Sequence, residues 1–310
     1  MKKKQKILSV QANALSSINI KTDTTLLLCS EAQKRGFKIF WYETKNLSIQ
    51  NTRVFAKGYF VNFSNEKKVF YKIIKKTELD LSKSDYLLVR QNPPFNMDYV
   101  ISTLYLEKII NSVKIINNPI SIRNVSEKFY STKFFRFMPP TIFTKNIQKI
   151  YTFHKKYKKV VLKPIDGYAG KEILFLNKKL NKSKINQYIS RKGHVMVQKF
   201  LPQVEQGDKR VFIINGKVCG AIRRIPKKNS ILSNLSQGGK AVSTKLNYKE
   251  NRISKIIAKD LLKNKIYFAG IDFVGGYLIG DINVTSPTGL PQYKQLTGTN
   301  LAKVFWDNLL

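Results

Sequence analysis

Acidic residues, cysteines and histidines are all scarce in this chain of 310 residues. Cys29 and Cys219 lie far apart without the spacing of a metal site, which excludes a disulfide framework and a cysteine-bound zinc ion. We expect two buried free thiols in a reducing compartment. His154 and His194 lie near lysines and have no nucleophile close by in the sequence. This pattern argues against a histidine-dependent hydrolase triad.

Long apolar runs are also absent from the sequence. No run approaches the roughly 20 residues that span a bilayer. Residues 1–17 contain basic residues and a short apolar stretch, but Gln11 and Asn13 follow that stretch at once, unlike a signal peptide. The sequence therefore predicts a cytoplasmic protein without a membrane partner.

The scarcity of acids leaves 56 Lys and Arg against 19 Asp and Glu, a formal net charge of +37. Such a charge is compatible with a polyanionic partner such as a nucleic acid. The lysines are, however, spread along the whole chain in runs of no more than three. This diffuse pattern favours solvated surface over a nucleic-acid site, which is kept as an alternative.

Residues 1–122 alternate strand and helix patterns. An N-cap at Asp23 and a stop at Gly36 bound the first expected helix. The spacing of the elements predicts an open parallel sheet covered by helices, an α/β domain. The strands are expected at 6–10, 38–43, 85–90 and 113–117, and the second helix at 98–111.

Residues 123–310 predict a second domain of α+β type with mostly antiparallel strands. Asn215-Gly216 is a strong hairpin turn between two of them. A short helix is expected at 126–135 and a longer one at 249–263, followed by a last hairpin and a C-terminal helix. The strands before that hairpin are expected at 159–164, 171–176, 194–200, 209–216 and 217–224.

The last hairpin combines two of the few acids with an apolar face. With Gly275-Gly276 as its turn, Val274 would lie opposite Tyr277, Asp272 opposite Ile279 and Gly270 opposite Asp281. Strand alternation then places three oxygen-bearing side chains on one face, and two carboxylates with an amide oxygen suit Mg²⁺. The alternative is two surface aspartates and an asparagine that begins a turn. The three side chains are Asp272, Asp281 and Asn283.

Two further stretches suit a nucleotide. In "LKPIDGYAG" (162–170) a glycine turn follows Lys163, which could neutralise phosphate, although an ordinary hairpin turn is the simpler interpretation. In "VQKFLPQVEQGDKRV" (197–211) the backbone of Lys199 and Leu201 could contact a base edge and Asp208 a ribose. The alternative for Asp208 is a salt bridge.

The chain resembles the bacterial-type glutathione synthetase family of the ATP-grasp superfamily. The resemblance is colinear over nearly the whole chain, and its most specific parts are "GDKRV" and "INVTSPTG". The motifs are "INIKTDTTLLLCSEAQKRG" (18–36), "VRQNPPFNMDYVISTLYLE" (89–107), "NNPISIRNVSEKF" (117–129), "LKPIDG" (162–167), "FLPQVEQGDKRV" (200–211), "RRIP" (223–226) and "INVTSPTG" (282–289).

The resemblance implies a pre-ATP-grasp domain (1–122) followed by an ATP-grasp domain (123–310), and an ATP-dependent ligase. ATP would phosphorylate γ-glutamylcysteine, and glycine would attack the acyl phosphate to give glutathione. A homo-oligomer and Mg²⁺, with Mn²⁺ as an alternative, are also implied. The implied residues are Lys128, Lys163, Gly167 and Gly170 for phosphates, Lys199, Phe200 and Leu201 for adenine, Asp208 for ribose, Arg210 and Arg224 for catalysis, Asp272, Asp281 and Asn283 for the metal, and 225–241 for a closing loop.

The sequence also departs from the family's motifs. Gln91, Asn92 and Asn96 replace charged residues, Asp281 replaces a glutamate, and Leu232 replaces an arginine. The family's "DGMGG" reads "DGYAG" here, and its "IREIE" reads "LPQYK" at 290–294, with Pro291 for arginine and Gln292 for glutamate. An ATP-grasp ligase with a different acid or amine, and a relic that only binds nucleotide, therefore stay open as alternatives.

Overall fold

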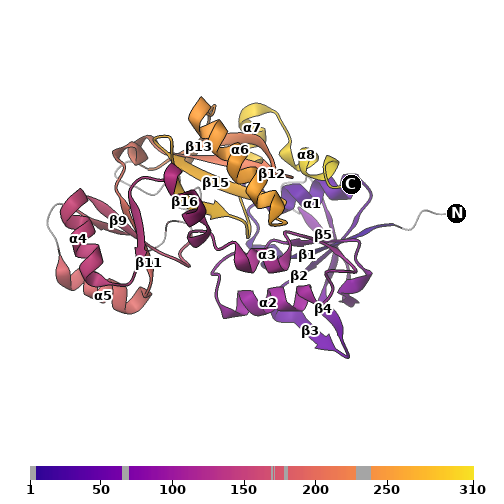
Figure 1. Cartoon of the computed structure of the whole chain (residues 1–310). Coiled ribbons are helices and arrows are strands. Elements are labelled where there is room, and N and C mark those ends of the chain that lie inside the picture. The colour runs from indigo at the N-terminus through magenta and orange to yellow at the C-terminus, as the bar shows by residue number, and fades with distance from the viewer. Residues whose placement is uncertain (1–4, 65–69, 169, 171, 178–180, 228–238) are drawn as a thin grey trace.

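The computed structural model describes residues 5–64, 70–168, 170, 172–177, 181–227 and 239–310. Within this part the chain forms three sheets. Figure 1 shows the N-terminal sheet with helices α1 to α3 at one end of the molecule, and a lobe with α4 and α5 at the other. The sheet that carries the last hairpin lies between them, covered by α6.

The N-terminal sheet confirms the predicted parallel core: β1 pairs in parallel with β2 and β6, and β6 with β7. The side chain of Asp23 caps α1 by accepting a hydrogen bond from the Leu26 amide. The antiparallel strands β3, β4 and β5 were not predicted. The elements are β1 (Ile7–Gln11), α1 (Thr24–Lys34), β2 (Lys38–Tyr42), β3 (Leu47–Gln50), β4 (Arg53–Phe63), β5 (Tyr71–Asp80), β6 (Tyr86–Val89), α2 (Met97–Glu107), β7 (Lys114–Ile116) and α3 (Pro119–Asn124).

The two remaining sheets are antiparallel, as predicted, and run in the orders β10-β9-β11-β8 and β14-β13-β12-β15-β16. The short helix expected at 126–135 is a 3₁₀ segment at Phe129–Phe137. The other elements are β8 (Thr141–Thr144), α4 (Ile147–Tyr157), β9 (Val160–Pro164), β10 (Leu174–Leu176), α5 (Lys182–Lys192), β11 (Val195–Lys199), β12 (Asp208–Ile214), β13 (Lys217–Ile225), β14 (Lys240–Ser243), α6 (Tyr248–Lys263), β15 (Phe268–Val274), β16 (Tyr277–Asn283), α7 (Leu290–Thr297) and α8 (Leu301–Asp307).

The predicted register of the last hairpin is correct only beside its turn. Val274 lies opposite Tyr277, as expected, but Gly270 lies opposite Asn283 instead of Asp281. The register shifts between Ile271 and Phe273, so the expected pairing of Asp272 with Ile279 is also wrong. The cause is a bulge in β16 at Gly280, whose φ is +88°. A Cβ at this position would lie 2.3 Å from the Met196 Cε, so glycine permits the strand to pass there.

Two buried contacts hold the N-terminal sheet against the rest of the chain. The Asn117 side chain accepts hydrogen bonds from the amides of Tyr267 and Phe268 and donates to the carbonyls of Phe268 and Val284, all at 2.7–2.8 Å. The Trp306 indole in α8 donates to the Leu28 carbonyl in α1 at 2.9 Å. The last hairpin and the C-terminal helices are therefore fixed relative to the loops of the N-terminal sheet.

The thiols and the membrane prediction can also be compared with the fold. Cys29 is fully buried, whereas Cys219 is only half-buried, so the prediction of two buried thiols is correct for one of them. Within the residues that the structure describes, no helix has the length and apolar character needed to cross a membrane.

Candidate functional site

A cavity of about 1040 Å³ is lined by residues of all three sheets or of their connecting loops. The loops that follow β1 and β6 contribute Asn13 to Asp23 and Asn92 with Pro93. These loops leave the carboxyl ends of parallel strands, where open α/β sheets bind ligands. The cavity thus combines the ligand-binding edge of the first sheet with the faces of the other two.

Every candidate site residue from the sequence lines this cavity. They come from positions far apart in the chain, and the fold brings them together in a single site. They are Lys128, Lys163, Gly167, Gly170, Lys199, Phe200, Leu201, Asp208, Arg210, Arg224, Asp272, Asp281 and Asn283.

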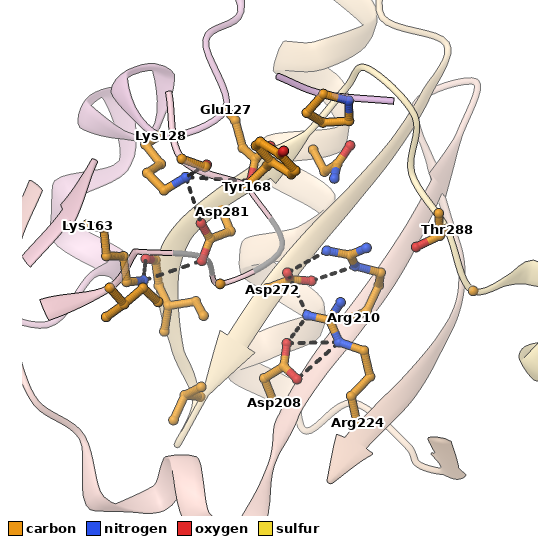
Figure 2. Close-up of a pocket in the computed structure, with 18 of the residues that line it drawn as sticks. Glu127, Lys128, Lys163, Tyr168, Asp208, Arg210, Arg224, Asp272, Asp281 and Thr288 are labelled. Carbon is orange, nitrogen blue, oxygen red and sulfur yellow. Dashed lines mark hydrogen bonds and ion pairs between the residues drawn. The ribbon is translucent and has the colours of Figure 1, made fainter. Parts of the chain in front are cut away.

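Four of these side chains form a buried network of alternating charge, seen in Figure 2. Arg210 lies opposite Asp272 in the strand register and binds it through two hydrogen bonds of 2.9 and 2.7 Å. Arg224 lies opposite Asp208 and binds both of its oxygens, and it also donates to Asp272 at 2.8 Å. Strand pairing therefore places each arginine directly against an aspartate.

The network shifts the protonation of its members. Burial alone would raise the pKa of Asp272, but Arg210 and Arg224 hold it below the ordinary value of an aspartate. Burial would lower the pKa of Arg224, but Asp208 and Asp272 raise it above its ordinary value. Asp272 is therefore a carboxylate at neutral pH. Asp208 is engaged in the salt bridge that the sequence left as the alternative, and its role on ribose stays a prediction.

The second acidic position of the hairpin has lysine partners. The Lys163 Nζ lies 3.3 Å from one Asp281 oxygen and donates to the Ile279 carbonyl at 2.9 Å. The Lys128 Nζ lies 3.7 Å from the other Asp281 oxygen and donates to the Gly167 carbonyl. Figure 2 shows the two lysines converging on Asp281. Two ammonium groups thus surround a carboxylate that was predicted to bind metal.

The donor atoms at this face fit a hard divalent cation. The Asn283 Oδ1 is buried and has no hydrogen-bond partner among the described residues, so it is an acceptor that needs a ligand. It shares the cavity with the carboxylates of Asp272 and Asp281. In the described part of the chain, no three His, Cys, Asp or Glu side chains gather closely enough to hold a metal. An ion here would complete its coordination with phosphate oxygens and water.

The predicted adenine contacts are met only in part. Lys199, Phe200 and Leu201 line the cavity, and the Phe200 ring packs on Phe175 at 4.8 Å between centroids. The Lys199 amide, however, donates to the Pro140 carbonyl at 2.9 Å. That amide is therefore not free to donate to a base edge.

Sequence reasoning missed Glu127, which lines the cavity next to Lys128. Its carboxylate lies 3.8 Å from the Lys128 Nζ. Burial raises the pKa of Glu127, Lys128 opposes this shift, and Asp281 adds to it. The available signal was its position in the motif "NVSEKF", directly before Lys128 in a chain with few acids.

Two departures from the family's motifs lie outside the cavity's lining. Gln91 is buried, bonded to the Gln11 side chain and to the Ser102 hydroxyl at 2.8 Å. Asn96 caps α2 by accepting a hydrogen bond from the Tyr99 amide at 3.0 Å. These neutral residues are thus explained by local structure. Asn92 and Gln292 do line the cavity, and Pro291 lies in the first turn of α7.

The predicted closing loop, 225–241, falls for the most part outside the described residues, as does Leu232.

Comparisons with known proteins cover both halves of the chain. Residues 7–123 match the family model "Prokaryotic glutathione synthetase, N-terminal domain", and residues 127–298 match "Prokaryotic glutathione synthetase, ATP-grasp domain". The glutathione synthetase of Mesorhizobium japonicum is 35% identical over 303 residues, 97% of this chain and 96% of that protein. The glutathione synthetase of Buchnera aphidicola subsp. Baizongia pistaciae is 35% identical over 97% of this chain and 95% of that protein.

Solved structures share the fold at low sequence identity. A D-cycloserine synthetase superposes with a TM-score of 0.68 at 14% identity, covering 98% of each chain. D-alanyl-alanine synthetase A from Vibrio cholerae superposes with a TM-score of 0.62 at 13% identity, covering 98% of this chain and 96% of that one. The ATP-grasp fold expected from the sequence is therefore confirmed.

Proposed function

The chain belongs to the prokaryotic glutathione synthetase family and is an ATP-dependent ligase, and we propose that it joins γ-glutamylcysteine to glycine through the cavity described above. The observation that carries the proposal is the convergence of two lysines, two arginines and an Asp/Asp/Asn oxygen set in one cavity. Cations and hard oxygen donors are the groups that phosphoryl transfer requires, and no protein nucleophile is needed.

Asp272, Asp281 and Asn283 would hold Mg²⁺, or Mn²⁺ in its place, whose charge would neutralise the nucleotide's phosphates. Lys128 and Lys163 would bind phosphate oxygens, because a cation at Asp281 would replace them as its partners.

Arg210 and Arg224 would stabilise the negative charge on the phosphorylated carboxylate. Both are held in fixed orientations by Asp272 and Asp208, so little rearrangement is needed when charge develops. The bond from the terminal phosphorus of ATP to its bridging oxygen breaks, and the substrate carboxylate becomes an acyl phosphate. Attack by the glycine nitrogen then forms the amide bond and releases phosphate. The acyl phosphate must be kept from water, since hydrolysis would waste it.

We further propose a domain division at 122/123, a cytoplasmic location and a homo-oligomeric state. The gap between the two family matches, after residue 123 and before residue 127, supports the division. The number of subunits can be measured by analytical ultracentrifugation.

The experiment that tests the function is phosphate release from ATP and Mg²⁺ with γ-glutamylcysteine and glycine, with each component left out in turn. We expect release that requires both acceptors, and glutathione as the product. Binding of ATP without release would instead favour another acid and amine pair, or the nucleotide-binding relic, and a panel of acceptors would separate these two. Tight binding of RNA or DNA without ligase activity would favour the nucleic-acid alternative.

A further inference from the structure

We propose that Asp23 and Gln292 together bind the ammonium group at the γ-glutamyl end of the acid substrate. This inference rests on the proposed function and assigns a specificity role to two residues that line the cavity from opposite halves of the chain.

The fold brings these two residues to one place. The hydroxyl of Thr24, next to Asp23, accepts hydrogen bonds from the amides of Gly289 and Leu290 at 3.1 and 3.3 Å. Arg90 donates to the Pro287 carbonyl at 2.9 Å and fixes the same segment. Gln292 follows two residues after Leu290, in the first turn of α7. The start of α1 and the start of α7 are therefore joined at the cavity wall.

Gln292 carries an unused acceptor at this junction. Its Oε1 is buried and has no hydrogen-bond partner among the described residues, although the residue lines the cavity. A buried acceptor without a partner costs about 1–3 kcal/mol, so a ligand that supplies a donor would recover this cost. The missing partner must be a donor such as an N–H group.

Asp23 supplies the charge that selects a cation. Its Oδ1 accepts from the Leu26 amide at 2.7 Å, and its other oxygen receives no hydrogen bond from the described residues. The other residues through which the N-terminal half lines the cavity up to position 93 are neutral: Asn13, Ser17, Asn19, Thr22, Asn92 and Pro93. This side of the cavity is therefore rich in acceptors and carries one negative charge, which suits an ammonium group.

The chemistry of the reaction decides which ammonium is bound. The glycine nitrogen is the nucleophile and must lose a proton before it attacks. A carboxylate beside it would favour the protonated form and oppose the reaction. The γ-glutamyl ammonium takes no part in bond formation and gains from staying charged. Asp23 and Gln292 therefore select the acid substrate and leave the amine free.

The test compares γ-glutamylcysteine with glutarylcysteine, which lacks only the ammonium group. The kcat/KM for each is measured in the wild type, Asp23→Asn and Gln292→Leu, with ATP and glycine saturating. Asn is as good an N-cap as Asp, so Asp23→Asn keeps the helix start while removing the charge. Gln295→Leu, an exposed position on the same helix, is the matched control.

We expect the wild type to prefer γ-glutamylcysteine by roughly 10- to 100-fold, the range of a charge-assisted hydrogen bond. In both site variants this preference should shrink to a few-fold, because only the ammonium-bearing substrate loses a contact. The KM for ATP should not change, and Gln295→Leu should match the wild type. Gln292→Glu should lower the KM for γ-glutamylcysteine, since a carboxylate binds ammonium more strongly than an amide oxygen does.

Each result has a separate meaning. A wild type that makes no glutathione would overturn the proposed function. A wild type that makes glutathione, with the same substrate preference in Asp23→Asn and Gln292→Leu, would overturn this inference alone. A loss of ATP binding in either variant would also overturn it, since the role would then be structural.

Discussion

Asp272 and Asp281 lie on the same hairpin and line the same cavity, but they have different kinds of positive partner. Asp272 has two arginines set against it by strand pairing, and its side chain is 4% exposed. Asp281 follows the bulge at Gly280, has two lysines 3.3 and 3.7 Å away, and is 20% exposed. The first arrangement is part of the sheet, whereas the second belongs to the surface of the cavity.

The difference teaches which acid can change its partner. A guanidinium is planar and stays charged, and two parallel hydrogen bonds fix it on a carboxylate. An ammonium on a flexible stem makes single contacts and can move to a stronger anion. We therefore expect the Asp272 network to be a fixed structural unit and Asp281 to exchange its lysines for a metal ion when nucleotide binds.

The largest expected effect is on stability. Asp272→Ala should lower the free energy of unfolding by about 3–5 kcal/mol, because it leaves two buried guanidinium groups without a full set of partners. Asp281→Ala should lower it by less than about 1 kcal/mol, since its lysines make weaker, partly exposed pairs. Urea unfolding of both variants at neutral pH measures the two values. Equal losses would show that the two acids have the same structural role.

The next effect concerns the metal. Asp281→Asn should weaken the binding of Mn²⁺ in the presence of ADP by at least about tenfold, since an amide is a poorer ligand than a carboxylate. Asp281→Glu, which restores the residue usual in the family, should retain binding. Calorimetric titration gives both affinities, and an unchanged melting temperature serves as the control for folding. Retained affinity in Asp281→Asn would remove Asp281 from the metal site.

A smaller effect should separate the lysines from the arginines. Lys163→Met should raise the Kd for ATP about tenfold, or ~1.4 kcal/mol, through the loss of a phosphate contact. The same change should strengthen Mn²⁺ binding without nucleotide, because Asp281 loses a competing cation. Lys182→Met, at an exposed position on α5, is the matched control. Weaker Mn²⁺ binding in Lys163→Met would contradict the exchange of partners at Asp281.

The sequence predicted the parallel core of the first sheet and the antiparallel strands of the second half, because apolar periodicity and the turns at Asn215-Gly216 and Gly275-Gly276 are local signals. It also gave every candidate site residue, through motifs whose order survives in this chain. The antiparallel strands at 47–80 escaped because residues 71–78 are largely exposed and show no apolar alternation.

The register at Asp281 could not be predicted from the sequence. Gly280 looked like an ordinary strand residue, and the bulge depends on the distant Met196 side chain, which leaves no space for a Cβ. The lysine partners of Asp281 and the role of Gln91 likewise depend on contacts between segments far apart in the sequence. Local patterns thus identified the chemistry of the residues, and only the fold shows which of them are paired.

The last effect is one of pH, and it should be absent at working pH. Arg210 and Arg224 hold the folded pKa of Asp272 below its unfolded value of about 3.9. A lowered folded pKa means that the network's stabilisation is fully present above that unfolded value and is lost as the pH falls through the folded pKa. The difference in unfolding free energy between the wild type and Asp272→Asn should therefore stay constant from about pH 5 to 8 and shrink below about pH 4. Urea titrations of both proteins at several pH values measure it, and a difference that already shrinks near pH 6 would place Asp272 outside the arginine network.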